Sequence, residues 1–90
     1  MTTNISSEYE DKIREFLGRD ILFTDDFPYG DDASFIEQSI VDSMGVIQVV
    51  MFVQSVFGIQ VDPGEITREN FDSVRKLAAY VRGKSAALPG

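Results

Sequence analysis

The sequence predicts an all-α fold: a small four-helix bundle with three main helices, one short helix and a long first loop. Three observations lead to this prediction. The chain has 90 residues, of which 43% are hydrophobic and 26% charged, so it can form one small core in one domain, residues 1–90. Two segments repeat apolar residues at helical spacing. A third segment of fifteen residues has no charge and is longer than a typical buried strand.

The first helix is predicted over about residues 7–18. Ser7 and Glu10 have the spacing of a capping box, in which both side chains accept hydrogen bonds from free amides at the helix start. Gly18 is a typical helix end. The apolar residues between them share one helical face, which consists of Tyr9, Ile13, Phe16 and Leu17.

Residues 19–41 are predicted to form a long connection, in which Pro28 and Gly30 disfavour regular structure. Five aspartates make it acidic: Asp20, Asp25, Asp26, Asp31 and Asp32. Apolar residues are interspersed with them, so we expect the connection to pack on the core. These are Ile21, Leu22, Phe23, Phe27, Phe35, Ile36, Ile40 and Val41.

The segment 43–57 is predicted to form the second helix. Ten of its fifteen residues are apolar and none is charged. Its β-branched residues would also suit a strand, but its length and the good helix start at Asp42 and Ser43 favour a helix that Gly58 ends. A helix that is apolar on most sides buries one face and leaves apolar surface on another, where we expect a partner to bind.

Two helices are predicted after the Asp-Pro-Gly turn. Thr67 is the expected cap of a short helical turn that ends at Phe71. An Asp-Ser pair then precedes the final helix, which we expect to end at Gly83. The ordered core would cover about residues 7–83 and leave 84–90 as a loose tail. The apolar face of the final helix contains Val74, Leu77, Ala78, Tyr80 and Val81.

The residue types that are absent exclude most kinds of catalysis. The chain has no histidine and no cysteine, so it has no Ser-His-Asp triad, thiol nucleophile, disulfide or thiolate zinc site. We therefore expect that it is not an enzyme. The first loop does not follow the ligand order of an EF-hand in a register that starts at Asp25 or at Asp26. We expect no metal site, and a calcium-responsive protein is the weakest alternative.

Negative charge is concentrated in the first half of the chain. Residues 1–43 contain eleven acids and three bases, whereas residues 44–90 contain four acids and five bases. Such a surface disfavours nucleic acid and attracts partners with basic patches, although solubility alone would also explain the acidity. Residues 1–4 do not resemble a signal peptide, and no apolar run is long enough to span a membrane. We expect a cytoplasmic monomer without a membrane span.

The strongest candidate for a functional residue is Ser43, at the start of the apolar helix. Free backbone amides and the positive end of the helix dipole favour an anion there, so a phosphate ester on this serine would be stabilised. Asp42 can be the helix cap, and an ordinary capping pair is the alternative interpretation of both residues. Ser39, the other serine nearby, is interpreted as loop packing.

The segment Ile-Val-Asp-Ser-Met-Gly-Val at 40–46 resembles the attachment motif of acyl carrier proteins, whose core is Asp-Ser-Leu. The order of the surrounding features agrees. An amphipathic first helix and a long loop precede the motif, which opens a second helix with Phe57 near its end. Val-Asp-Pro at 61–63 follows, and residues 74–81 resemble the final helix of that family. The resemblance covers about residues 7–83.

This resemblance to the phosphopantetheine-binding carriers, which include peptidyl and aminoacyl carriers, implies a function. A phosphopantetheinyl transferase would use coenzyme A to attach 4′-phosphopantetheine to Ser43, and the thiol of the arm would hold an acyl or aminoacyl group as a thioester. By match to the motif, Asp42 would help to position the transferase and hold the helix start. The protein would be a free-standing carrier. The alternative function is an unmodified helical adaptor that docks a partner through the apolar face of helix 43–57.

The resemblance also implies a face for partner enzymes. Met44, Ile47 and Met51 follow one another at spacings of three and four residues, on a face that runs back to Ser43. Core packing is the alternative for these three side chains. Partner contact is favoured because other residues of the same helix can fill the core, namely Val49, Val50, Val53 and Phe57.

The second helix departs from the family pattern at several positions. Met44 replaces the usual leucine, which conserves volume, and Gly45 weakens the first helical turn relative to alanine. Fatty-acid carriers usually bear glutamates along this helix, and the corresponding positions here are Gln48 and Gln54. This favours a specialised pathway, with an adenylating ligase that loads the cargo and a downstream acyltransferase, over housekeeping fatty-acid synthesis. The residues do not distinguish a fatty, polyketide or peptide cargo.

Overall fold

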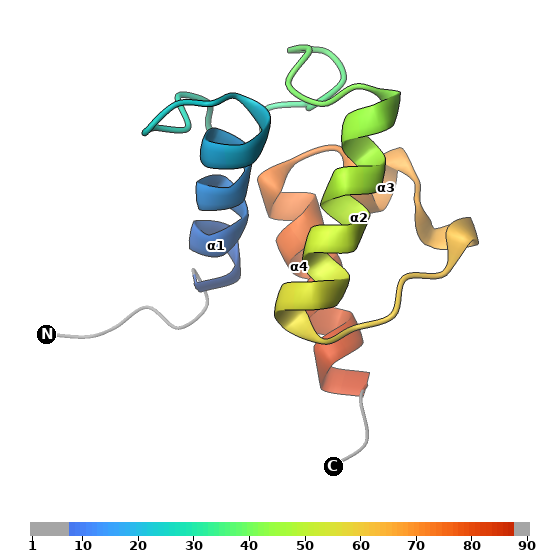
Figure 1. Ribbon diagram of the computed structural model, residues 1–90. Helices are drawn as coiled ribbons and strands as arrows, with labels where there is room; N and C mark the ends of the chain where they lie inside the picture. Colours follow the sequence, from blue (N-terminus) through green and yellow to red (C-terminus); the bar gives the residue numbers. More distant parts are fainter. Residues whose placement is uncertain (1–7, 88–90) are drawn as a thin grey trace, which may run out of the picture.

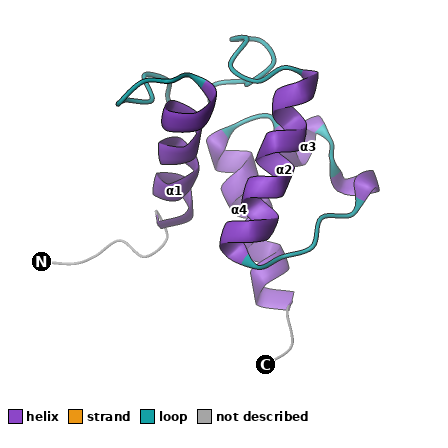
Figure 2. Cartoon of the chain, viewed as in Figure 1, coloured by secondary structure: helices purple, strands orange, loops and turns teal. Residues whose placement is uncertain are grey.

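The computed structural model describes residues 8–87 (Figures 1 and 2). This part of the chain contains four α-helices, a π-helical turn and a 3₁₀ turn, joined by loops. Their order along the chain is α1 (Glu8–Phe16), η2 (Leu17–Ile21), α2 (Ser43–Phe57), η3 (Pro63–Glu65), α3 (Arg68–Phe71) and α4 (Val74–Ala87). No strand occurs within these residues. The predicted all-α bundle with three main helices and one short helix is confirmed.

The last helix, α4, is the central element of the bundle. It contacts α1, α2 and α3, and Figure 1 shows it behind α2 with α1 to one side. The core is formed by apolar side chains from all of these elements and from the long loop. Its fully buried members of largest volume are Phe35, Ile13, Leu17, Leu77, Val49, Val53, Val74 and Val81.

The first helix continues beyond the predicted end at Gly18. Ile13 and Leu17 are fully buried, which confirms the apolar face, but the backbone runs on through η2. Gly18 is buried, and a Cβ atom there would lie 3.4 Å from the carbonyl oxygen of Thr24. Its carbonyl accepts a hydrogen bond of 2.7 Å from the Thr24 amide of the returning loop, and the helical backbone continues through it, so Gly18 does not end the helix. Ser7, part of the predicted capping box, lies outside the described residues.

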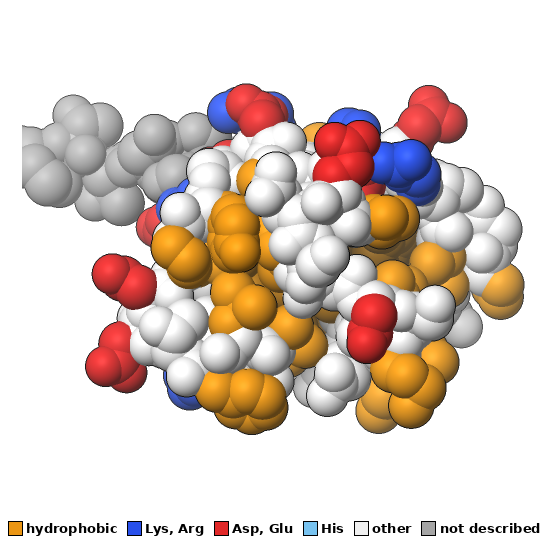
Figure 3. Space-filling model, turned by 90° about the horizontal axis from the view of Figure 1, so that it is seen from above, with side chains coloured by type: hydrophobic (Ala, Val, Ile, Leu, Met, Phe, Trp, Pro, Cys, Tyr) orange, Lys and Arg blue, Asp and Glu red, His pale blue; other side chains and the backbone are white. Residues whose placement is uncertain are grey.

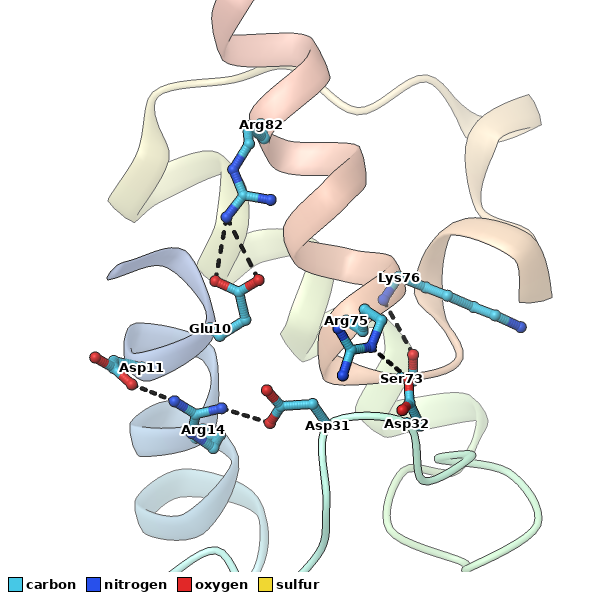
Figure 4. Close-up of polar contacts among 9 residues, drawn as sticks. All are labelled: Glu10, Asp11, Arg14, Asp31, Asp32, Ser73, Arg75, Lys76 and Arg82. Atoms are coloured by element: carbon cyan, nitrogen blue, oxygen red, sulfur yellow. Dashed lines mark hydrogen bonds and ion pairs between the residues drawn. The ribbon is translucent and has the colours of Figure 1, made fainter. Parts of the chain in front are cut away.

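Polar contacts connect α1 with the loop and with α4 (Figure 4). The Arg14 guanidinium of α1 pairs with the carboxylate of Asp31, and Arg75 of α4 pairs with the next aspartate. Arg82 of α4 donates a hydrogen bond of 3.1 Å to Glu10 of α1. These partly exposed pairs each contribute little free energy. Two of them join the middle of the loop to α1 and to α4, and the third joins the two helices directly.

The loop between η2 and α2 packs on the core only in part. Phe35, Ile40 and Val41 are buried, which confirms the expectation for these residues. Phe23 and Ile36 were expected to pack with them, but both are exposed, Phe23 to 85%. Phe23 has a positive φ of 57°, a left-handed backbone conformation within a sharp turn that leaves its side chain in solvent.

A buried carboxylate anchors the second half of this loop. Asp72, between α3 and α4, accepts hydrogen bonds from Ser34 Oγ (2.7 Å), the Ile36 amide (3.1 Å) and Arg68 Nη2 (3.2 Å). Its backbone carbonyl accepts a further bond of 2.7 Å from the Phe35 amide. Burial alone would raise the pKa of Asp72, but the three bonds to its carboxylate outweigh this effect and hold the pKa below the usual range.

The starts of α3 and α4 agree with the prediction from the sequence, with one difference. Thr67 occupies the cap position of α3, as predicted, but its side chain makes no capping hydrogen bond. Ser73 precedes α4, and its hydroxyl accepts a hydrogen bond of 3.0 Å from the Lys76 amide. The predicted Asp-Ser pair therefore divides its roles, because the aspartate anchors the loop and the serine caps the helix.

The predicted end of the final helix at Gly83 is wrong, since α4 runs on to Ala87. Gly83 does not have a positive φ. The ammonium group of Lys84 lies 3.1 Å from the carboxylate of Glu65 in η3, so a tertiary contact supports the extra turn. Four residues of the expected tail are thus helical, and residues 88–90 lie outside the described part.

We expect Asp72→Asn to lower the free energy of unfolding by about 1–3 kcal/mol at pH 7, because a neutral amide cannot accept the same set of hydrogen bonds. The folded pKa of Asp72 is lowered, so its contribution is present above the ordinary carboxyl pKa and is lost as the pH falls through the folded value. The difference from the wild type should therefore shrink as the pH drops below about 4. Urea unfolding at several pH values measures this difference.

The matched control is Asp25→Asn, since Asp25 is exposed and forms no ion pair within residues 8–87. It should change stability by less than about 0.5 kcal/mol. Equal stability of the two variants at pH 7 would contradict an anchoring role for Asp72.

Candidate functional site

The candidate serine, Ser43, is the first residue of α2 and lies where the long loop meets that helix (Figure 1). Asp42 precedes it in an extended conformation, with φ −100° and ψ −172°. Its carboxylate accepts a hydrogen bond of 2.8 Å from the Gly45 amide, and its carbonyl accepts one of 2.9 Å from Val46. The predicted cap and the predicted helix start are both confirmed.

The two residues before the cap fix the chain to the core. Ile40 and Val41 are buried, and their amides both donate to the carbonyl of Phe35, at 2.8 and 3.3 Å. Asp42 and Ser43 follow directly and are exposed. The core therefore fixes the backbone directly before the exposed residue Ser43.

Gly45 has a packing role that the sequence did not indicate. It is buried, and a Cβ atom there would lie 3.0 Å from Val41 Cγ1 and 3.3 Å from Asp42 Oδ1. The first turn of α2 thus presses against the end of the loop, and glycine permits that approach. The sequence predicts only that Gly45 weakens the helix. The contacts that bury it form in the folded structure and leave no local pattern in the sequence.

The start of α2 is chemically suited to a phosphate ester. The first turn contains no acidic residue, and the whole of Ser43–Phe57 carries no formal charge. In the first turn, the Gly45 amide already donates a hydrogen bond to the Asp42 carboxylate. The positive end of the helix dipole is directed toward the position that a phosphate on Ser43 would take.

One face of α2 is apolar and exposed. Met44, Ile47 and Met51 are exposed to 74%, 58% and 63%, whereas Val49 and Val53 are buried. Core packing, the alternative for the three exposed residues, does not apply. Figure 3, which views the end that bears the loop and the start of α2, shows hydrophobic groups exposed among acidic ones. Contact with a partner through this face stays a prediction.

The two glutamines of α2 have different surroundings. Gln48 is exposed, whereas the side-chain oxygen of Gln54 accepts a hydrogen bond of 3.0 Å from the Val61 amide. Gln54 therefore holds the segment that follows α2. Only Gln48 remains as a neutral residue on the surface where fatty-acid carriers usually bear an acidic one.

Ser39, the alternative serine, lies in a different setting. It is exposed, so its interpretation as loop packing is wrong. Its φ is 56° and its amide donates a bond of 3.1 Å to Ile36, so it belongs to a turn and has no helix start behind it. It provides a natural comparison for Ser43.

Residues 8–87 contain neither a metal-binding cluster nor a membrane-spanning helix. No three carboxylates in this range gather closely enough to hold a metal ion. No helix in it has both the length and the apolar character needed to cross a bilayer.

Comparison with known proteins places this site in a family. The model described as "Phosphopantetheine attachment site" matches residues 11–81, which include the Asp-Ser start of α2. The chain belongs to the phosphopantetheine-binding carrier proteins. Carriers of this family hold a covalently attached 4′-phosphopantetheine and are not enzymes, so the predicted family, cofactor and non-catalytic role are confirmed.

Several relatives of this carrier are D-alanyl carrier proteins. That of Abiotrophia defectiva is 33% identical over 57 residues, which are 63% of this chain and 72% of the relative. That of Lactococcus lactis subsp. cremoris MG1363 is 34% identical over 62 residues, 69% of this chain and 78% of the relative. That of Lacticaseibacillus casei BL23 is 32% identical over 62 residues, 69% of this chain and 76% of the relative.

We expect Asp42→Ala to lower the free energy of unfolding by about 0.5–2 kcal/mol, because the Gly45 amide loses its capping acceptor. Asp42→Asn should retain most of the stability, since an amide oxygen can accept the same bond. Urea unfolding measures the change, and hydrogen exchange at the Gly45 amide should become faster in Asp42→Ala alone. Equal exchange in both variants would argue against the cap.

Proposed function

We propose that this carrier holds a small aminoacyl group as a thioester on a 4′-phosphopantetheine arm attached to Ser43, and that it presents the group to partner enzymes. The observation that carries the proposal is the exposed serine at the capped start of α2, inside the segment that the phosphopantetheine attachment model matches. When bound, the arm supplies the thiol that the chain itself lacks.

The residues around Ser43 fit a phosphodiester. Its hydroxyl is exposed, so a transferase can reach it, and the buried pair Ile40 and Val41 keeps its base in place. Asp42 would hold the helix start while its carboxylate is directed to the Gly45 amide. The phosphate would then lie at the positive end of an otherwise uncharged helix.

Two observations support a small aminoacyl cargo. The relatives are D-alanyl carrier proteins, and an aminoacyl cargo agrees with that name. The apolar hollow between α2 and α3 has a volume of about 120 Å³. This is well below the ~300–1,000 Å³ of pockets that hold drug-sized ligands. The hollow is lined by Ile36, Val46, Ile66, Thr67, Arg68, Phe71 and Asp72.

The partners we propose are a phosphopantetheinyl transferase, an adenylating ligase that loads the amino acid, and a transferase that receives it. Met44, Ile47 and Met51 would contact them, because this exposed apolar face lies next to Ser43. A neutral Gln48 on that face supports a partner set other than that of fatty-acid synthesis. We propose the cytoplasm, where coenzyme A is available, as the site of action of a monomeric carrier.

Incubation with coenzyme A, magnesium and a broad-specificity phosphopantetheinyl transferase should add one phosphopantetheinyl group to the protein, read as a single increment in intact mass. Ser43→Ala should abolish the increment, since within residues 8–87 the other serine that follows an aspartate, Ser73, is buried.

Ser39→Ala is the matched control, because Ser39 is also exposed but lies in a turn. It should be modified like the wild type. An increment that survives in Ser43→Ala and disappears in Ser39→Ala would refute the assignment. An unmodified wild-type chain, with a control carrier modified in the same assay, would favour the adaptor function instead.

The cargo is tested on the pantetheinylated protein. An adenylating ligase for D-alanine, with ATP, should form a thioester that hydroxylamine releases. An acyl–carrier synthetase with palmitate should acylate the same protein at least about tenfold less efficiently, as judged against a fatty-acid carrier. Efficient palmitoylation would contradict the proposed cargo.

A further inference from the structure

The turn after η2 exposes a phenylalanine in a strained conformation. Phe23 is the most exposed large hydrophobic residue of the described part, at 85%, and its φ is 57°. A positive φ is uncommon for a bulky residue, and it persists only where the surrounding structure imposes it. An exposed side chain on a strained backbone points to a functional role for this residue instead of a role in stabilising the fold.

Hydrogen bonds on both sides hold this residue in place. The amide of Leu22 donates to Leu17 at 2.9 Å, and the amide of Thr24 donates to Gly18 at 2.7 Å. Gly18 is buried beneath this turn, and a Cβ atom there would lie in ordinary contact, 3.4 Å from the carbonyl oxygens of Thr24 and Asp26. The projection of Phe23 into solvent is therefore built into the backbone.

Phe23 lies between two surface hollows that reach α2. One of about 300 Å³ is lined also by Asp42 and Met44, beside the start of the helix. The other, of about 720 Å³, is lined also by Met51 and Val56, farther along it. The exposed ring thus extends the apolar face of α2 across the molecule toward η2.

The rim of this surface is acidic. Asp20, Asp25 and Asp26 are exposed on the turn, whereas α2 carries no charge. Within residues 8–87, Asp25 and Asp26 take part in no ion pair, and the two arginines that line a hollow with them are paired with other carboxylates: Arg14 with Asp11 and Asp31, and Arg19 with Asp20 at 3.7 Å and Glu15 at 4.0 Å. A complementary surface presents an apolar socket with lysine or arginine around it.

We propose that Phe23 is an anchor that inserts into such a socket on the phosphopantetheinyl transferase. This partner transfers 4′-phosphopantetheine from coenzyme A to the Ser43 oxygen: the pyrophosphate bond of coenzyme A breaks, adenosine 3′,5′-bisphosphate leaves and the serine proton is released. The transferase must therefore sit over the start of α2 and over the hollow that Phe23 shares with Asp42 and Met44. The inference rests on the proposed attachment at Ser43. Buried aromatic anchors of this kind carry a large share of the affinity at protein interfaces.

Steady-state kinetics of a broad-specificity transferase, with coenzyme A and the unmodified chain as substrates, tests the proposal. Phe23→Ala should raise the KM for the chain at least about tenfold, as expected for an anchor residue. Complete modification at Ser43 should still be reached at high concentration. Gln60→Ala, which shortens an exposed side chain that lines none of these hollows, is the control and should keep the KM within about twofold.

Phe23→Gly separates docking from a structural role. Glycine adopts a positive φ without strain, so the urea midpoint should be unchanged or higher while the KM rises as in Phe23→Ala. Asp25→Asn combined with Asp26→Asn should also raise the KM and reduce its dependence on salt. A KM within about twofold of the wild type for Phe23→Gly overturns the anchor alone. A wild-type chain that is not modified at Ser43 overturns the proposed function as well.

Discussion

The carboxylate of Asp72 accepts hydrogen bonds from a serine hydroxyl, a backbone amide and a guanidinium, although only 4% of the residue is exposed. A buried carboxylate is tolerated only when its oxygens are satisfied in this way. Its donors come from the loop and from α3, so the loop must meet the junction of α3 and α4. Phe35 then enters the core, and its carbonyl receives the amides of Ile40 and Val41 directly before the cap. The position of Ser43 thus depends on a group far from it in the sequence.

The two faces of α2 differ in burial. Val49 and Val53 bury one face against the core, and Met44, Ile47 and Met51 leave the other in solvent. The side chains of α2 carry no charge, whereas the loop beside it exposes several aspartates. Charges at the edge of an interface mainly speed encounter, whereas the apolar centre provides affinity. In the proposed partner contacts, the two contributions would therefore come from different elements.

The features that could be predicted from the sequence are those with local causes. Asp42 caps α2 through the Gly45 amide, and Gly58 ends it with φ 68°, so both bounds of this helix were correct. Gly18 and Gly83 looked like the same helix-ending feature, but neither ends a helix. Gly18 is buried under the returning loop and bonded to it through its carbonyl, and the turn after Gly83 is supported by a side-chain contact with η3. Such contacts join distant residues, and no local pattern reveals them.

The candidate site also contains both local features, which the sequence could predict, and tertiary ones, which it could not. The Asp-Ser motif is contiguous, so the sequence could identify it, whereas the buried Gly45 and the exposed Phe23 depend on how the loop returns over η2 and meets α2. A carrier needs a fixed point for its arm, because the arm supplies the movement. The cap, the glycine contact and the buried residues before them provide that fixed point. The fixed start of α2 and the exposed groups around it therefore follow from the loop conformation, which the buried carboxylate of Asp72 helps to hold.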